Sequence, residues 1–249
     1  MTEEEYNNLD GLRASNIKAY ISNPDKHAYE LENPATEIPA HFKLGTAIHM
    51  AYYEPERYKT AYHIYEGKTI ASGAPNAAGV KELKAEGITE YLTTVETAMI
   101  ADIVKGLPKL DEKATVEQTF TKVVDGVLLK CRVDAIINGK GQDLKTTQDA
   151  SPMKFKWAIR DFQYLYQFAF YSIVTGVTEW EILAVEKKPP YINHTYTITA
   201  EDLEPYINGS DTVRGLLGTY GLIKEYDTWL INGKPKQGYG ENTKISELW

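Results

Sequence analysis

Cysteine is nearly absent from this chain of 249 residues, which contains only Cys131. A single cysteine cannot form a disulfide within the chain, nor supply the four thiolates of a zinc or iron–sulfur site. A run of about 18 apolar residues is also missing, so the sequence predicts no transmembrane helix. The N-terminal segment MTEEEYNNLDGL lacks the basic and apolar regions of a signal peptide, so we expect a cytoplasmic protein.

Positive charge is also scarce. The chain has 27 Lys and Arg against 35 Asp and Glu, a net charge of −8, which disfavours a broad nucleic-acid-binding surface. A local basic groove can coexist with an acidic exterior, so a nucleic-acid enzyme is not excluded. Without a visible repeat or linker, we expect one domain over residues 1–249, with a core at about 12–190, a C-terminal helical region at 200–231 and a polar tail at 232–249.

Residues 116–147 are typical of three strands joined by two tight turns. Asp125-Gly126 and Asn138-Gly139 are dipeptides preferred in two-residue hairpin loops, where both central residues need positive φ. Such short loops fix which residues of neighbouring strands face each other, because a bulge would turn every following side chain to the other face.

With these loops, Glu117 lies opposite Asp134, and Asp134 lies opposite Asp143. Three carboxylates then form a row with neighbouring Cβ atoms roughly 5 Å apart, and Lys145 points to the same face as Asp143. Like charges facing each other destabilise a sheet, so the row indicates a bound divalent cation, Mg²⁺ or Mn²⁺. With a lysine beside it, this site favours metal-assisted hydrolysis of a phosphodiester.

A structural explanation remains open for the same row. The acids could lie on an exposed face of the sheet and pair with Lys130, Arg132 and Lys145. Lys130 and Arg132 share the face of the acids, and they either contact phosphates of DNA or balance the carboxylates.

Helices and further strands are expected on both sides of this hairpin region. The patterns predict helices at 15–21, capped by Ser15, at 41–54, at 89–104 and at 152–175, and strands at 62–67, 180–188 and 192–199. The helix at 41–54 carries His49 in apolar surroundings. The helix at 152–175 carries Gln167 within a stripe of aromatic residues, where a buried amide needs hydrogen-bond partners.

Five segments resemble the RecE-type exonucleases (exonuclease VIII) and their phage relatives, within the PD-(D/E)XK nuclease superfamily. They are GTAIHMAYYEPERY at 45–58, VEQTF at 116–120, KCRVDAI at 130–136, DLKTTQDASP at 143–152 and YQFAFY at 166–171. Asp134 followed by Asp143-Leu144-Lys145 resembles the signature itself. Val133 replaces its proline, and Asp143 stands where many members have glutamate.

The resemblance implies an α/β fold with a PD-(D/E)XK restriction-endonuclease-like core, a mixed β-sheet flanked by helices. It implies an Mg²⁺-dependent exodeoxyribonuclease that degrades linear double-stranded DNA from 5′ to 3′ in recombination, in a bacterial or phage-infected cell. It further implies a ring-shaped homo-oligomer and a single-strand annealing protein as partner. Membrane association is not expected.

The resemblance also assigns roles to residues. Glu117, Asp134 and Asp143 would hold one or two Mg²⁺ or Mn²⁺ ions, with the Leu144 carbonyl and His49. Lys145 would orient the attacking water. The roles near DNA fall to Gln167 and Tyr171, which match the motif Q-x-x-x-Y, and to Tyr164. Arg132 and Lys130 are further candidates for binding the substrate, because they share the face of the acids.

Other functions remain compatible with the sequence. On the same core, the chain could be a structure-specific or single-strand nuclease, or a hydrolase of another phosphoester. From a different class, it could be a catalytically idle DNA-binding accessory protein of recombination.

Overall fold

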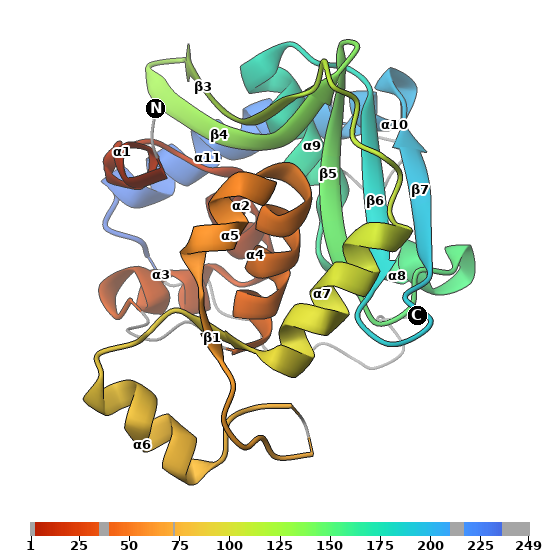
Figure 1. Cartoon of the computed structure of the whole chain (residues 1–249). Coiled ribbons are helices and arrows are strands. Elements are labelled where there is room, and N and C mark those ends of the chain that lie inside the picture. The colour runs from red at the N-terminus through yellow and green to blue at the C-terminus, as the bar shows by residue number, and fades with distance from the viewer. Residues whose placement is uncertain (1–2, 35–39, 72, 210–216, 236–249) are drawn as a thin grey trace, which may run out of the picture.

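A five-stranded mixed sheet forms the centre of the fold (Figure 1). The computed structural model describes residues 3–34, 40–71, 73–209 and 217–235. The strand order is β3-β4-β5-β6-β7, in which β5 and β6 run parallel and the other neighbours antiparallel. The strands are β3 (Thr115–Val124), β4 (Val127–Ile137), β5 (Lys140–Thr147), β6 (Trp180–Glu186) and β7 (Asn193–Ile198).

Helices precede, connect and follow these strands. They are α1 (Glu3–Asn8), α2 (Ala14–Ser22), α3 (Pro24–Glu32), α4 (Ala40–Tyr53), α5 (Pro55–Ala61), α6 (Ala77–Ala85), α7 (Thr94–Gly106), α8 (Pro152–Asp161), α9 (Tyr164–Thr175), α10 (Ala200–Asn208) and α11 (Thr219–Ile231). Two short strands, β1 (His63–Tyr65) and β2 (Tyr91–Thr93), pair in parallel beside α7. No helix in the described ranges is both long enough and apolar enough to cross a membrane.

The two hairpins that organise the sheet are confirmed. Val124 pairs with Val127 and Ile137 with Lys140, so each loop has two residues. Both residues of each loop have positive φ, between 49° and 86°. Local turn chemistry therefore determines where β3, β4 and β5 begin and end.

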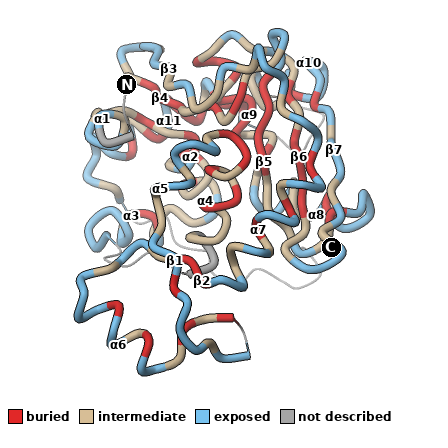
Figure 2. The backbone as a smooth tube through the Cα atoms, viewed as in Figure 1, coloured by how far each residue is buried: buried red, intermediate tan, exposed pale blue. Residues whose placement is uncertain are grey.

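Each face of the sheet is covered by a separate apolar core. On one face, Leu129 and Cys131 of β4 pack with Phe168 of α9 and with side chains of α2, α10 and α11. On the other face, Leu144 of β5 packs with Ile48 of α4 and with α7. The buried residues are concentrated in the central strands and in the helices that pack against them (Figure 2). Helix α4 is thereby held against β5, the strand that carries Asp143 and Lys145.

The register of the predicted acid row is confirmed only in part. The β3–β4 ladder keeps the same register on both sides of Glu117 and Asp134, so these residues stand opposite each other. Glu117 has a φ of 51°, and the ladder omits this pair. The β4–β5 ladder ends at Ala135 and Gln142, one residue before Asp134 and Asp143. Beyond this point β5 remains paired with β6, on its other edge, as far as Thr147.

Three element predictions were wrong in detail. The helix expected at 152–175 is two helices, because Gln163 adopts a φ of 52° between α8 and α9. Residues 91–93 of the helix expected at 89–104 form strand β2. Helix α2 begins at Ala14, so its N-cap is Arg13 and not Ser15. Most of the tail predicted at 232–249 lies outside the described residues.

Candidate active site

A cleft of about 910 Å³ opens beside the C-terminal half of β5. Its walls come from α1 and α2, from α4, from β5 and from the α8–α9 region. Of the predicted site residues, Glu117, Asp134, His49, Lys145, Gln167, Tyr164 and Arg132 line it, together with Leu144. Packing of α4 and α9 on opposite faces of the sheet thus brings distant segments of the chain to one place.

Three of these side chains can share a metal ion. His49, Glu117 and Asp134 each offer one ligand atom, and these atoms all lie within 4.8 Å of one another. One imidazole and two carboxylates form a donor set that suits a divalent cation such as Mn²⁺ or Mg²⁺. Glu117 has a left-handed backbone within β3, with a φ of 51°, at the position opposite Asp134.

His49 connects the acids to the backbone of β5. Its Nδ1 lies 3.3 Å from Oδ2 of Asp134, and its Nε2 lies 2.6 Å from the carbonyl oxygen of Leu144. The backbone N–H of Leu144 donates to Oδ2 of Asp134 at 2.9 Å. A metal ion bound through either ring nitrogen would therefore replace a contact that already orients the imidazole.

Asp143 lies apart from that cluster. The Lys145 ammonium is 2.6 Å from Oδ2 of Asp143, and Nε2 of Gln167 donates to Oδ1 at 2.8 Å. Oδ1 of this buried carboxylate thus accepts a hydrogen bond and Oδ2 has the Lys145 ammonium as its ion-pair partner, which supports a role in positioning Lys145. The separation of β4 from β5 accounts for the difference from the expected row of three carboxylates.

Electrostatics ties the two acids to the lysine. Burial raises the pKa of Asp134, and the neighbouring Asp143 carboxylate raises it further, while His49 acts in the opposite sense. Burial alone would lower the pKa of Lys145, but the carboxylates of Asp143 and Asp134 outweigh it and raise that pKa. Lys145 therefore stays positively charged, whereas Asp134 ionises less readily than an exposed aspartate. A divalent cation bound beside Asp134 would favour its ionised form.

Lys18 of α2 is a site residue that the sequence did not indicate. Its ammonium donates to Oε1 of Gln167 at 3.2 Å and lies 5.3 Å from the centre of the Tyr164 ring. Burial, followed by repulsion from Lys145, lowers the pKa of Lys18 to about 8. No local motif marks this lysine, because its partner Gln167 is 149 positions away in the chain.

Arg132 and Tyr164 lie where a substrate could reach them. Nε of Arg132 donates to Oε2 of Glu117 at 2.7 Å, so the guanidinium balances one of the acids at the cleft wall. The ammonium groups of Lys18 and Lys145 lie over the Tyr164 ring, at 5.3 and 5.1 Å from its centre.

Lys130 and Tyr171 do not line the cleft. The structure does not support the prediction that Lys130 contacts DNA, because its buried ammonium contacts the carbonyl oxygens of Tyr6 and Leu9 at the end of α1. Tyr171 packs against the ring of Trp180, behind the acids. It can support the site from beneath but does not face the open cleft.

A family model described as a PDDEXK-like domain of unknown function, DUF3799, matches residues 14–232. A search with the sequence among curated proteins found no match.

Solved structures give a second comparison. A crystal structure from Eubacterium rectale, provisionally described as an exonuclease, superposes with a TM-score of 0.64 at 14% identity, covering 100% of this chain and 97% of that chain. A phage related exonuclease from Haemophilus somnus gives a TM-score of 0.38 at 13% identity, covering 91% of this chain and 97% of that chain. The first likeness supports the fold over the whole chain.

Proposed function

Because this chain belongs to the family of PDDEXK-like domains, and so to the PD-(D/E)XK nuclease superfamily, we propose that it is a metal-dependent exodeoxyribonuclease. The family and the fold support nuclease activity in general terms. The observation that carries the proposal is the cluster of His49, Glu117 and Asp134 beside the Asp143–Lys145 ion pair in one cleft. In detail, we propose that the enzyme hydrolyses linear double-stranded DNA from 5′ to 3′ and acts in recombination.

The residues present fit a divalent metal ion, Mg²⁺ or Mn²⁺. His49, Glu117 and Asp134 would hold it, and the raised pKa of Asp134 reflects a carboxylate that gains from a nearby cation. The Leu144 carbonyl and Asp143 are further proposed ligands, for the same ion or for a second one. When bound, the ion polarises the scissile phosphate and stabilises the leaving oxygen.

Lys145 supplies the second part of the chemistry. The carboxylates of Asp143 and Asp134 keep its ammonium charged by raising its pKa, and the ion pair with Asp143 fixes its position. An ammonium held there can orient the attacking water and stabilise negative charge that develops on the phosphate. Gln167 holds Asp143 from the other side, so it positions Lys145 indirectly.

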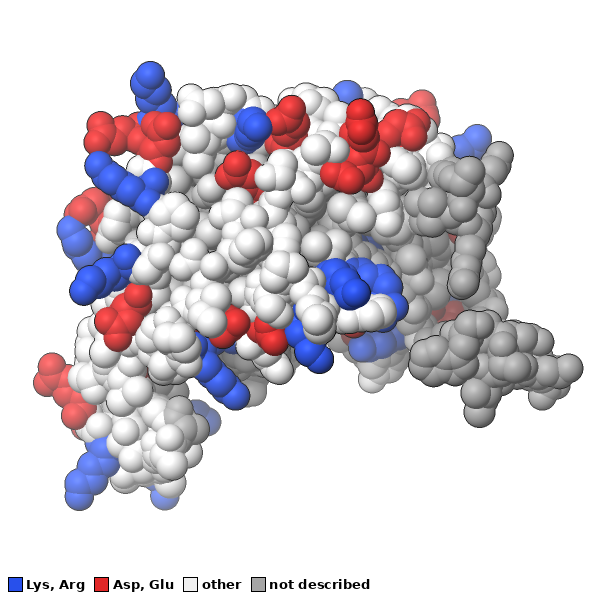
Figure 3. Space-filling view, turned by 90° about the vertical axis from the view of Figure 1, so that its right-hand side faces the viewer, with Lys and Arg blue, Asp and Glu red and all other residues white. Residues whose placement is uncertain are grey.

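Binding of the DNA backbone would fall to a few cations of the cleft. Lys18 contacts the neutral amide of Gln167, and Lys187, directly after β6, also lines the cleft. By contrast, Arg132 is already paired with Glu117. On the face that carries α8, lysine and arginine side chains lie interspersed with acidic ones (Figure 3). A local basic site of this kind suits a chain of net charge −8.

The proposal is tested by digesting linear double-stranded DNA labelled at its 5′ ends, with Mg²⁺ and with EDTA, beside the variant Lys145→Ala. We expect Mg²⁺-dependent release of label as short products, and a loss on the order of 10²-fold or more in the variant, because a preorganised charge at the reacting phosphate is removed. Calorimetric titration with Mn²⁺ should show that this variant still binds metal.

Other substrates distinguish the remaining possibilities. Cleavage confined to single strands or to flaps would replace the exonuclease by a structure-specific nuclease on the same core. Metal binding without cleavage of linear, nicked or single-stranded DNA would favour a DNA-binding accessory protein. Assembly into a ring, a single-strand annealing partner and a cytoplasmic location remain parts of the proposal, to be tested by mass measurement in solution, by co-purification and by cell fractionation.

A further inference from the structure

An exposed aromatic ring stands at the rim of the cleft, at the break between α8 and α9. Phe162 ends α8 and lines the cleft, yet 59% of its surface is exposed. The next residue, Gln163, holds a left-handed φ of 52°, which a side chain other than glycine adopts at a cost. A strained break that leaves a phenylalanine in solvent beside a candidate active site calls for a functional explanation.

Phe162 continues a line of rings that begins inside the site. It stacks on Tyr164, with ring centres 5.7 Å apart and planes at 25°. The ammonium groups of Lys18 and Lys145 in turn lie 5.3 and 5.1 Å from the centre of the Tyr164 ring. One face of the Phe162 ring is therefore covered by an aromatic neighbour that adjoins the lysines, and its outer side meets solvent at the cleft mouth.

The surroundings of the ring match the chemistry of a single nucleic-acid strand. A phosphate held by Lys18 or Lys145 would place the attached nucleoside next to the Tyr164–Phe162 pair. Every base has a flat π face, and stacking on an aromatic side chain is independent of its identity. The cations that adjoin this ring pair make an acidic partner protein a weaker fit than a strand that carries both phosphates and rings.

We propose that Phe162 is a stacking platform for an unpaired base of the DNA strand whose backbone enters the cleft. This inference rests on the proposed function, because it gives that same site a preference for DNA with a frayed or single-stranded end. The Tyr164 ring supports the platform from beneath, and the turn at Gln163 keeps Phe162 out of the helix packing. The affinity gained is independent of the sequence of the DNA.

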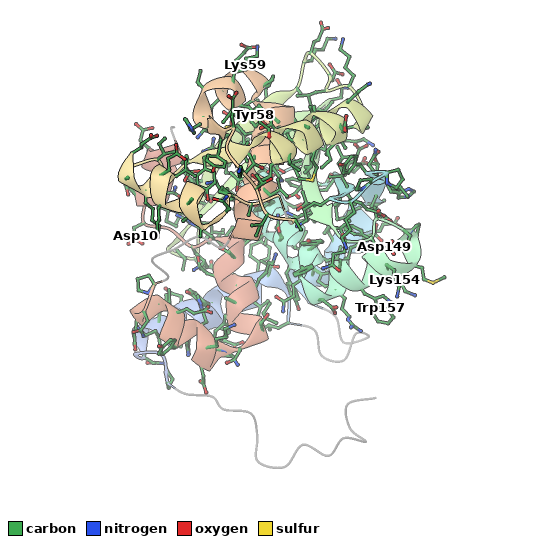
Figure 4. All side chains as sticks on the ribbon, turned by 60° about the horizontal axis from the view of Figure 1, so that its bottom comes forward. Asp10, Tyr58, Lys59, Asp149, Lys154 and Trp157 are labelled. Atoms are coloured by element: carbon green, nitrogen blue, oxygen red, sulfur yellow. The ribbon has the colours of Figure 1, made fainter. Side chains whose placement is uncertain are left out.

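Trp157 offers a matched control on the same helix. It is also exposed, at 46% of its surface. Its ring is already accompanied by the Arg160 guanidinium at 4.4 Å and the Lys156 ammonium at 5.1 Å. Figure 4 shows Trp157 on the outer surface of α8, and it is not among the described residues that line the cleft. Removing its ring should therefore leave the platform intact.

The experiment uses the full chain in EDTA, so that binding is observed without cleavage. The probes are duplexes with a short 5′ or 3′ single-stranded tail that carries 2-aminopurine at successive positions from the duplex junction. Stacking quenches the fluorescence of this base. We expect quenching of severalfold at one or two neighbouring positions. Phe162→Leu should abolish it, whereas Phe162→Trp and Trp157→Ala should preserve it.

A second readout separates this inference from the proposed function. The readout is cleavage in Mg²⁺ of two substrates, one intact and one with an abasic residue at the quenched position. Phe162→Leu should lower kcat/KM about tenfold on the intact substrate and should leave kcat/KM on the abasic substrate unchanged. If the unmutated protein and Phe162→Leu quench equally at every position, the proposal that Phe162 is a stacking platform is wrong, even if the enzyme cuts DNA. Position-specific quenching without any cleavage would retain the platform and reject the nuclease. Absence of DNA binding rejects both.

Discussion

At the scale of single residues, the candidate site is divided between a metal cluster and a lysine held by its own acid. His49, Glu117 and Asp134 converge on one point, whereas Asp143 is engaged by Lys145 and Gln167. Two carboxylates that a continuous ladder would place in one row thus have different neighbours. Their substitution should consequently have different effects on metal binding and on catalysis.

The first prediction concerns metal affinity. Glu117→Gln and Asp134→Asn each remove a charged ligand, so calorimetric titration with Mn²⁺ should show a loss of at least about tenfold in affinity. Asp143→Asn should lower kcat more than it lowers metal affinity, because it releases Lys145 from its ion pair. An equal loss of metal affinity in all three variants would instead place Asp143 among the principal ligands.

The second prediction concerns Lys18 and pH. Its pKa is lowered to about 8, so its ammonium loses its charge in the folded protein well below the ordinary value of about 10.4. DNA affinity, measured at constant salt by fluorescence anisotropy in EDTA, should fall roughly tenfold as the pH rises from 7 to 9. Lys18→Arg should keep its affinity over that interval, and Lys18→Met should be weak throughout.

Folding stability provides an independent check on the same group. Between pH 8 and about 10.4 the unfolded chain holds the Lys18 proton and the folded chain does not, so this lysine contributes stability that increases with pH. The contribution of Lys18 to stability and its contribution to DNA binding therefore change in opposite directions. Urea unfolding midpoints measured over the same pH interval test whether the protein merely unfolds. If they do not decrease, unfolding does not explain the loss of DNA affinity.

At the scale of secondary-structure elements, local chemistry explains which parts of the fold the sequence could predict. The β3–β4 and β4–β5 hairpins follow from Asp125-Gly126 and Asn138-Gly139, whose backbone preferences act over two residues. The break between α8 and α9 could not be predicted, because the apolar pattern continues through it. Gln163 is fixed from outside the helix, where Nε2 donates to Oγ of Ser22 in α2.

The third prediction concerns this break. Gln163 is in the left-handed region, and its buried Oε1 has no hydrogen-bond partner in the described part of the chain. Gln163→Gly should therefore raise the free energy of unfolding by about 0.5–1 kcal/mol, despite the added entropy of the unfolded chain. Gln163→Val should lower it by at least about 1 kcal/mol. Urea unfolding measures both, and stabilisation by valine would show that the left-handed turn is not required.

At the scale of the whole molecule, the site depends on contacts between segments that are distant in the chain. His49 reaches Leu144 across 95 positions, and Lys18 reaches Gln167 across 149. The sequence predicted His49, Leu144 and Gln167 through a family resemblance, and predicted the strand acids through hairpin register. It could not predict Lys18, nor that Lys130 would hold α1 and not face DNA, because only packing of the N-terminal helices decides both.

The last prediction follows from the contrast between an acidic molecule and a basic cleft. Because the molecule has a net charge of −8, DNA should be held only within the cleft, by Lys145 at the reacting phosphate and by Lys18 and Lys187. About three phosphate contacts give a slope near −3 in a plot of log affinity against log salt. Lys187→Ala should reduce that slope by about one unit. Its exposed neighbour Lys188 does not line the cleft among the described residues, so Lys188→Ala should leave the slope unchanged. Equal reductions in both variants would mean that DNA lies across the outer surface.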